Sequence, residues 1–351
     1  KRPHLPFTAP KKYWDMYEGR DIPEPEVPFL PYEDRDPWSQ RYFMTIRQDE
    51  FDITPKQLEN SRRAYFAMVT HIDELVGGLI ETLENIGQLD NTFVFLVSDH
   101  GEMLGERGMW FKFNPYESSL RVPMIMQGPG VKAGHKEEAL ASLVDLMPTF
   151  ADIANGGTFD GYVSPVDGRS LLERPDPNSL ENRVFIESTG ESLYGPAFIM
   201  IEGRKKLVYT RTDPKMFFDM DADPLELDNL AEAPEHQDQI NRMFTAMMER
   251  WDEEALEVRI RTSQKKRMFV HDAMNRRLNR LHLHRAFFQC PHNPRSQLSL
   301  VKRYSRAVPF NDARHHQFGG LKGGETLAAG EALTTTANRI ALIGEARIDY
   351  L

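Results

Sequence analysis

An acid, an imidazole and a glycine follow an apolar run in the first third of this chain. Residues 94–97 are Val, Phe, Leu and Val, and Asp99, His100 and Gly101 come after one serine. In an open α/β sheet, ligands bind beyond the carboxyl ends of the strands. Asp99 supplies a hard anionic oxygen and His100 a ring nitrogen, so the pair suits one divalent cation. The pattern predicts a metal site at the tip of a strand.

Lys112 adds a positive charge a short loop farther along the chain. A metal ion and a lysine together hold a tetrahedral oxyanion and neutralise the charge that develops as an ester bond breaks. The Asp-His-Gly tripeptide alone is a weak signal, because Asp and Gly are ordinary turn residues and a histidine after a strand is more often structural. Metal-assisted ester chemistry and a plain turn both remain open at this point.

The longer string is much more specific, since it includes the whole stretch 98–112 and the run 121–123. It resembles the metal- and sulfate-binding segment of the type I sulfatases, most closely the choline-sulfatase branch of the alkaline phosphatase-like superfamily. In that family the residues that match Asp99 and His100 bind Ca²⁺ or Mg²⁺, and the residue that matches Lys112 contacts sulfate. The resemblance implies a sulfuric ester hydrolase, with Ca²⁺ as the first candidate cation and Mg²⁺ or Mn²⁺ as alternatives.

Two further residues take their roles from the same resemblance. His4 stands in His-Leu-Pro-Phe, which matches the family's sulfate-contacting histidine, whereas an ordinary loop histidine is the alternative. Glu187 matches a family acid near the choline pocket, where a carboxylate can pair with a quaternary ammonium; an acid that serves only the fold is the alternative. The predicted set is therefore His4 and Lys112 as catalytic residues, His4, Lys112 and Glu187 for substrate binding, and Asp99 and His100 for the metal.

The sulfatase nucleophile is expected outside this sequence. The family oxidises the first residue of a Cys-x-Pro-x-Arg (or Ser) motif to formylglycine, and the family order places that motif before His4. The only cysteine, Cys290, has misplaced prolines and an arginine one residue too late, so we reject it as the nucleophile. We expect the 351-residue chain by itself to bind a cation weakly and to lack turnover, because two ligands leave a cation mostly hydrated.

The elements that must position these residues follow an α/β pattern. Thr54, Pro55 and Gln57 form a capping box that predicts a long amphipathic helix ending near residue 87. A strand buried on both faces, a second strand and another helix follow at 92–98, 122–126 and 139–154. We expect Asp145 in the last helix to be a solvated or capping acid. The resemblance implies a mostly parallel sheet flanked by helices, as in alkaline phosphatase.

A second region has short strands parted by turn residues and a polar helix near 235–256. Its strands are expected at 184–187, 197–201, 206–209 and 216–219. This predicts a small antiparallel α+β C-terminal subdomain. The predicted domains are the C-terminal part of the sulfatase α/β domain at 1–165, this subdomain at 166–262, and a basic, partly irregular tail at 263–351 that begins with a helix over 263–280.

Composition narrows the choice of partners and compartment. The net charge of −10 argues against a general nucleic-acid surface, and no apolar run is long enough to span a membrane. A single cysteine suits a reducing compartment, so the cytoplasm is expected and the periplasm is the alternative. The expected substrate is a small sulfate ester such as choline-O-sulfate, and the complete enzyme is expected to be a homo-oligomer. A phosphonate or phosphate ester hydrolase and a non-catalytic truncated remnant are the competing hypotheses.

Overall fold

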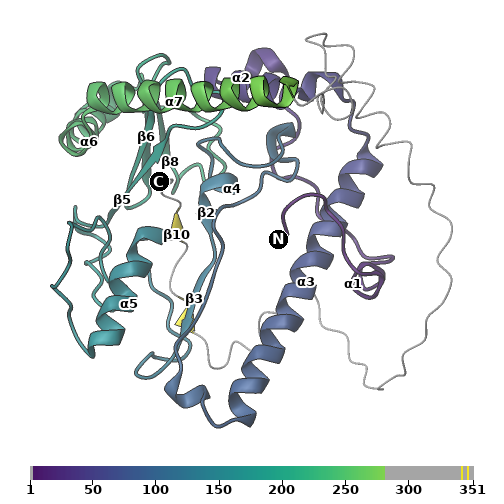
Figure 1. Cartoon of the computed structure of the whole chain (residues 1–351), viewed down its shortest axis with the longest axis vertical. Helices are drawn as coiled ribbons and strands as arrows, with labels where there is room; N and C mark the ends of the chain where they lie inside the picture. Colours follow the sequence, from purple (N-terminus) through teal and green to yellow (C-terminus); the bar gives the residue numbers. More distant parts are fainter. Residues whose placement is uncertain (1–2, 281–340, 343–345, 348–351) are drawn as a thin grey trace. The chain divides into compact units, whose positions relative to one another are not determined.

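The computed structural model describes residues 3–280, 341–342 and 346–347 (Figure 1). The chain divides into two compact units, residues 1–253 with 327–351 and residues 254–326. The second unit is described as one helix, α7 (Glu253–Arg280), which contains the predicted 263–280 helix. All the site residues and all the strands discussed below belong to the first unit. The predicted boundary at residue 165 remains a prediction.

Short helices and one long helix make up the N-terminal part. They are α1 (Lys11–Asp15), α2 (Pro37–Thr45) and α3 (Pro55–Asn85). The capping box at the start of α3 is confirmed, because Thr54 accepts from the Gln57 amide and the Gln57 side chain accepts from the Thr54 amide. Trp38 and Tyr42 on α2 are almost fully buried, so the proline- and aromatic-rich segment before α3 contributes to a core.

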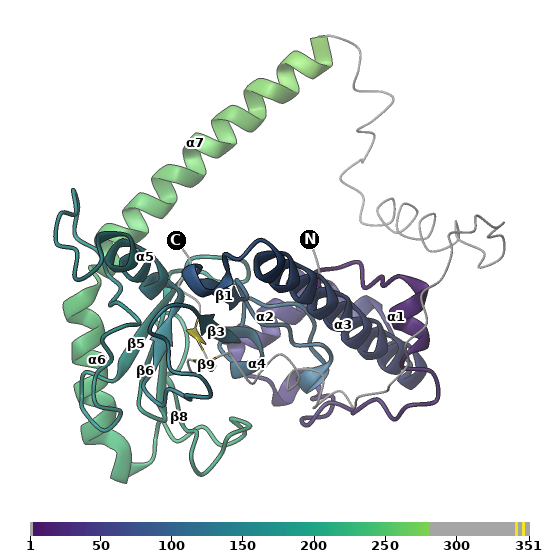
Figure 2. The same ribbon diagram turned by 90° about the horizontal axis from the view of Figure 1, so that it is seen from below.

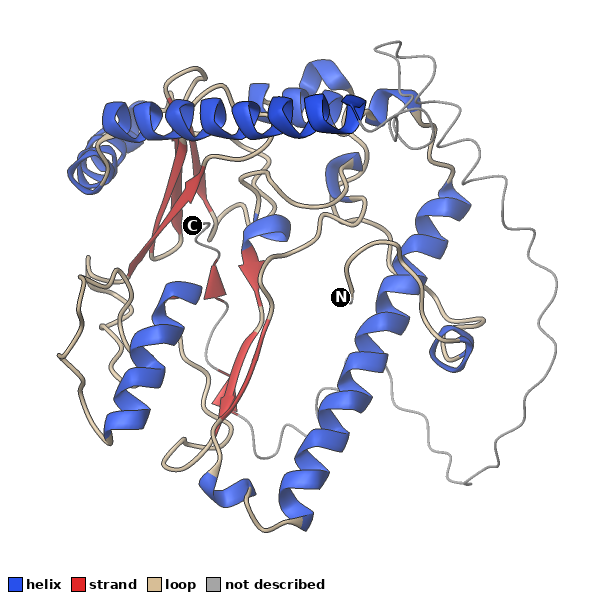
Figure 3. Cartoon of the chain, viewed as in Figure 1, coloured by secondary structure: helices blue, strands red, loops and turns tan. Residues whose placement is uncertain are grey.

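Two three-stranded sheets follow. Figure 3 shows the strands of the chain in red. One has the order β1-β3-β9 and the other β2-β10-β4. Their strands are β1 (Val94–Val97), β2 (Arg121–Val122), β3 (Met124–Gln127), β4 (Ala141–Ser142), β9 (Ala341–Leu342) and β10 (Ala346–Arg347). The predicted strand at 122–126 is interrupted at Pro123, which has no backbone N–H to donate.

Helices and strands alternate here as the predicted α/β fold requires, although the described strands of these two sheets pair mainly antiparallel and not mostly parallel. β1 pairs antiparallel with β3, and β4 with β10 is the one parallel pair among the described strands. The Gly101 amide donates to the Ser119 carbonyl at 2.8 Å, so the connecting loop stays at the carboxyl end of β1. The four-residue helix α4 (Glu117–Leu120) then sends the chain back in the opposite direction. A parallel return would need a crossover to the other end of β1.

Two local predictions were also wrong. β1 is half-buried rather than covered on both faces, and it lies at the edge of its sheet in the described part of the chain. The helix expected at 139–154 begins only at residue 146, as α5 (Leu146–Asn155), after β4 and a short 3-10 turn.

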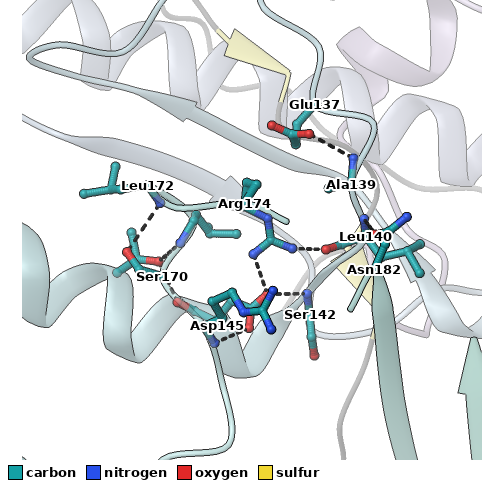
Figure 4. A network of polar contacts seen from close by, with 12 residues as sticks. Glu137, Ala139, Leu140, Ser142, Asp145, Ser170, Leu172, Arg174 and Asn182 are labelled. Carbon is teal, nitrogen blue, oxygen red and sulfur yellow. Dashed lines mark hydrogen bonds and ion pairs between the residues drawn. The ribbon is translucent and has the colours of Figure 1, made fainter. Parts of the chain in front are cut away.

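A buried polar network determines where α5 begins (Figure 4). Asp145 accepts from the amides of Ser142 and Arg169 at 3.0 and 2.8 Å, and its carboxylate lies 3.1 Å from the Arg174 guanidinium. Asp145 is buried, so it is a capping acid and not a solvated one. The Arg174 guanidinium also donates to the Leu140 carbonyl, which ties β4 to the same centre.

The C-terminal sheet is a regular antiparallel meander. Its strands are β5 (Arg183–Ser188), β6 (Ala197–Glu202), β7 (Lys205–Thr210) and β8 (Met216–Asp219), in that order. Helix α6 (Gln237–Arg250) packs against β6 and β7 (Figure 2). This confirms the antiparallel α+β part of the prediction. The helix predicted over 235–256 is broken after Arg250, so α6 and α7 are separate helices.

One hydrophobic core joins this sheet to the loop after β1. Met103, Met109 and Tyr116 from the loop are buried together with Ile199 and Val208 from the sheet. The loop that carries the candidate site residues is therefore packed on its inner side. No helix within the described ranges combines the length and apolarity needed to cross a bilayer.

Candidate functional site

The turn after β1 presents Asp99 and His100 side by side. The Asp99 side chain is 89% exposed, whereas that of His100 is 17% exposed, and Asp99 Oδ1 lies 3.8 Å from His100 Nε2. Two ligands at about 2.3 Å from one cation, at a right angle, would stand about 3.3 Å apart. A small movement of the exposed carboxylate therefore brings both atoms onto one ion. No cluster of three or more His, Cys, Asp or Glu ligands occurs among the residues the structure describes.

Backbone contacts orient both histidines of the predicted site. His100 Nδ1 lies 2.7 Å from the Gly101 carbonyl, and His4 Nδ1 lies 3.0 Å from the Leu5 carbonyl. Because a carbonyl oxygen only accepts, each Nδ1 donates and each Nε2 retains a lone pair in the neutral ring. This is the tautomer that binds a cation through Nε2, so His100 fits the role of a metal ligand.

His4 and Lys112 meet although 108 positions separate them. Lys112 Nζ lies 3.1 Å from His4 Nε2, and the ring centroids of His4 and His100 are 6.2 Å apart. An ammonium can only donate, so His4 Nε2 accepts from it. The structure thus brings together His4, Asp99, His100 and Lys112, the four residues predicted for sulfate and metal binding.

Gly101 is required by the shape of the turn. A Cβ at this position would lie 2.1 Å from the carbonyl oxygen of Ser118, closer than side chains can approach backbone. The Gly101 amide is used in the bond to the Ser119 carbonyl. The two residues before Gly101 are thereby held beside helix α4, to which Ser118 and Ser119 belong.

The loop that leads to Lys112 has a strained backbone. The left-handed residues other than glycine in this loop are Leu104, Arg107, Phe111 and Phe113. Phe111 and Phe113, with φ of +67° and +71°, stand on either side of Lys112. Each such residue costs on the order of 1–3 kcal/mol and persists only where surrounding contacts hold it, a situation that is common at functional sites.

Glu102 is a site residue that the sequence did not single out. Its Oε1 accepts from the amides of Phe111 at 2.5 Å and Leu104 at 3.3 Å. Burial raises the pKa of this carboxyl, while those two backbone bonds and then the charge of Lys112 oppose the rise. Burial, followed by the nearby Glu102 charge, raises the pKa of Tyr65 to about 12. The position of Glu102 directly after Asp-His-Gly was the one signal available from the sequence.

Aromatic rings line the chain beside these groups. Phe7 lies 6.3 Å from Trp110 and 5.9 Å from Tyr65 between ring centroids. Tyr42 donates to the Trp110 carbonyl at 3.1 Å, which anchors the residue two positions before Lys112.

Glu187 approaches the site through its strand. It stands one residue before the end of β5, opposite Phe198, and is half-buried. A Cβ at Gly190, just beyond this strand, would lie 3.6 Å from Phe113. The carboxyl end of β5 therefore abuts the Lys112 loop, and the role predicted for Glu187 remains a prediction.

A buried lysine fixes the outer end of the loop to the C-terminal sheet. The Lys206 side chain on β7 is 0% exposed, and its Nζ lies 2.8 Å from Glu117 Oε1 and forms an ion pair with Glu226. Glu226 also accepts from the Glu117 amide at 2.8 Å. Burial raises the pKa of Glu226, whereas the Lys206 charge lowers it. The cluster immobilises α4, whose carbonyls hold Gly101.

Two family models match most of this region. The Sulfatase model matches residues 1–156, and the model for the C-terminal part of N-sulphoglucosamine sulphohydrolase matches residues 105–253. These ranges include every predicted site residue.

Named relatives and solved structures agree with this match. The chain is 39% identical to a choline-sulfatase of Rhizobium meliloti (strain 1021), over 87% of this chain and 58% of the relative. It is 32% identical to an arylsulfatase of Clostridium perfringens, over 68% of this chain and 50% of the relative. The structure of a phosphonate monoester hydrolase from Silicibacter pomeroyi superposes with a TM-score of 0.60 and 28% identity, over 71% of this chain and 54% of that one. The chain thus spans between half and three fifths of the length of these proteins.

Proposed function

The chain belongs to the sulfatase family, and from that premise we propose that the loop from Asp99 to Lys112 is the sulfate-ester site of a choline-sulfatase-like hydrolase. The observation that carries the proposal is the meeting of His4 and Lys112 at 3.1 Å, beside the ring of His100. An ammonium and a protonated imidazole at this distance can each donate to one oxygen of the same tetrahedral anion.

Each residue has a specific part in this proposal. The Lys112 ammonium donates to an anionic sulfate oxygen. His4 acts in its protonated form, in which Nε2–H donates to a neighbouring oxygen and can give its proton to the departing alcohol. Asp99 Oδ1 and His100 Nε2 would hold the divalent cation, which supplies charge neutralisation when bound. The resemblance to the sulfatases makes calcium the first candidate cation, and magnesium or manganese are the alternatives; a carboxylate oxygen such as that of Asp99 suits all three.

The remaining parts of the proposal extend beyond these contacts. A choline-like ammonium would lie near Glu187, whose strand ends against Phe113. The formylglycine nucleophile, the homo-oligomer and the cytoplasmic location remain predictions that follow from the resemblance and composition. In this proposal Asp99 and His100 alone would bind the cation weakly, because two ligands leave it mostly hydrated.

The test is sulfate binding measured by calorimetry on the 351-residue chain with Ca²⁺ present. Lys112→Ala and His4→Ala should each weaken binding by about tenfold or more, because each removes a charged or charge-assisted hydrogen bond. Lys56→Ala is the matched control, since Lys56 is exposed and pairs only locally with Glu59. Equal affinities for the Lys112 and Lys56 variants would contradict the proposed site.

A second function has one observation in its favour, the superposition on a phosphonate monoester hydrolase. Sulfate and phosphonate esters present similar tetrahedral groups but differ in charge, so the same cation and lysine can serve either. Parallel binding measurements with choline-O-sulfate and a phosphonate monoester, each in the presence of Ca²⁺, discriminate between them. We expect neither to be turned over by the chain alone; turnover that survives Asp99→Ala would overturn the metal assignment.

A further inference from the structure

Lys112 owes its direction to the backbone on either side of it. Phe111 and Phe113 both adopt left-handed conformations, with φ of +67° and +71°. Residues with bulky side chains rarely adopt left-handed backbone dihedrals, because the side chain then contacts the backbone. The loop therefore needs contacts that hold it in place, and these contacts determine where the ammonium points.

Glu102 provides such contacts from the opposite side of the loop. Its Oε1 accepts from the Phe111 amide at 2.5 Å and from the Leu104 amide at 3.3 Å. The Met103 amide donates to the Phe111 carbonyl at 2.7 Å, so both polar backbone groups of Phe111 are engaged. One carboxylate oxygen thus joins the outgoing and returning parts of the loop.

Glu102 is itself fixed to the turn that carries Asp99 and His100. It follows Gly101, which is bonded to the Ser119 carbonyl and has no space for a side chain. A displacement of the Glu102 backbone would therefore require a displacement of the turn. The Glu102 carboxylate thus connects the turn that carries the predicted cation ligands to the backbone next to Lys112.

We propose that Glu102 is a positioning residue, which holds Phe111 in its left-handed conformation and thereby directs Lys112 toward His4. It acts through its hydrogen-bond acceptor oxygen and not through its charge. The identity of the anion that Lys112 binds rests on the proposed function, but the link between Glu102 and Lys112 does not.

The experiment measures the rate at which acetic anhydride labels Lys112, by mass spectrometry, with and without inorganic sulfate. Sulfate should slow the labelling of Lys112 in the unmodified chain and leave Lys56 unaffected. Glu102→Ala should change the labelling rate of Lys112 without sulfate severalfold. It should also weaken the protection by sulfate about tenfold, which is the effect of losing the charge-assisted hydrogen bond from Lys112 to sulfate. Glu102→Gln retains the acceptor oxygen and should behave as the unmodified chain.

Glu137→Ala is the matched control, because Glu137 also accepts a backbone amide, from Ala139 at 2.9 Å, but outside this loop. It should leave Lys112 labelling unchanged. If Glu102→Ala fails to fold, Glu102→Asp carries the test, since it keeps the charge and shortens the reach. Unchanged labelling in the folded Ala or Asp variant overturns the positioning role, as does a Gln variant that behaves like Ala. Absence of sulfate protection in the unmodified chain instead overturns the proposed function, while the unprotected rates still test Glu102.

Discussion

The loop between β1 and α4 and the sheet β5–β8 share one hydrophobic core but build their structure differently. Each pair of neighbouring strands in the sheet is antiparallel and pairs without interruption, and β6 is buried along its whole length. The loop places bulky residues in left-handed conformations and is held by single polar contacts, such as that from Phe111 to Glu102. Apolar burial supports the sheet, whereas a few specific acceptors keep the loop in a conformation that its sequence does not favour.

The largest expected effect is at Lys206, where the two regions join. Lys206→Met should destabilise the chain by about 3–5 kcal/mol, because it leaves Glu117 and Glu226 buried without their cation. Lys205→Met is the matched control on the same strand. Its ammonium is partly exposed beside Asp219, so we expect a loss of about 1 kcal/mol or less. Urea denaturation measures both, and similar losses would show that the junction does not depend on this cluster.

A smaller effect is expected at Gly101, within the loop. Gly101→Ala places a methyl group against the Ser118 carbonyl, so the turn must shift, at a cost of about 1–3 kcal/mol. Cation binding through Asp99 and His100 should fall with it, as measured by calorimetry with Ca²⁺.

Gly78→Ala in α3 is the control for the glycine substitution, since nothing lies within 4 Å of its added Cβ. It should stabilise the chain by up to about 1 kcal/mol, because alanine is the better helix former. If Gly101→Ala stabilised the chain as Gly78→Ala is expected to do, the turn at Gly101 would have space for a side chain, and the close contact with Ser118 would not restrict it.

The same contrast explains what the sequence could predict. The start of α3 was predictable because its capping box involves residues only three positions apart. The strands β5 to β8 were predictable from short apolar runs separated by turn residues. The start of α5 was only partly predictable. Asp145 forms a local capping box with Ser142, but it also bonds Arg174, which lies 29 positions away and leaves no sign in the local periodicity.

The candidate site was predictable in part. Asp99, His100, Gly101 and Lys112 lie within one short stretch of the sequence, so the pattern could be recognised directly, whereas His4 was predicted from the family resemblance. The contacts of Glu102 could not be predicted from its position after Asp-His-Gly, since they depend on the left-handed backbone of Phe111, where the sequence has no glycine to mark it. The burial of Lys206 could not be predicted either, because Glu117 lies 89 positions away.

The smallest expected effect is a pH dependence of the unfolding free energy, which arises from Glu226 in the cluster with Lys206 and Glu117. Burial raises the pKa of Glu226 above its ordinary value of 4.5. A raised pKa means that the folded chain holds this proton more tightly than the unfolded chain. The resulting stability is therefore fully present below about pH 4.5 and is lost as the pH rises through the folded pKa, with a slope of at most about 1.4 kcal/mol per pH unit.

Glu226→Gln should remove this dependence, because the amide accepts the Glu117 amide bond but does not titrate. The difference in unfolding free energy between the unmodified chain and this variant should therefore shift in favour of the variant as the pH rises from 4 to 8. The same substitution at exposed Glu232 controls for the general loss of one charge. A difference that stays constant, or that shifts toward the unmodified chain, would mean that Lys206 outweighs burial and holds Glu226 ionised throughout. Lys206, Glu117 and Glu226 would then all be charged, in contrast to the apolar burial that supports the sheet.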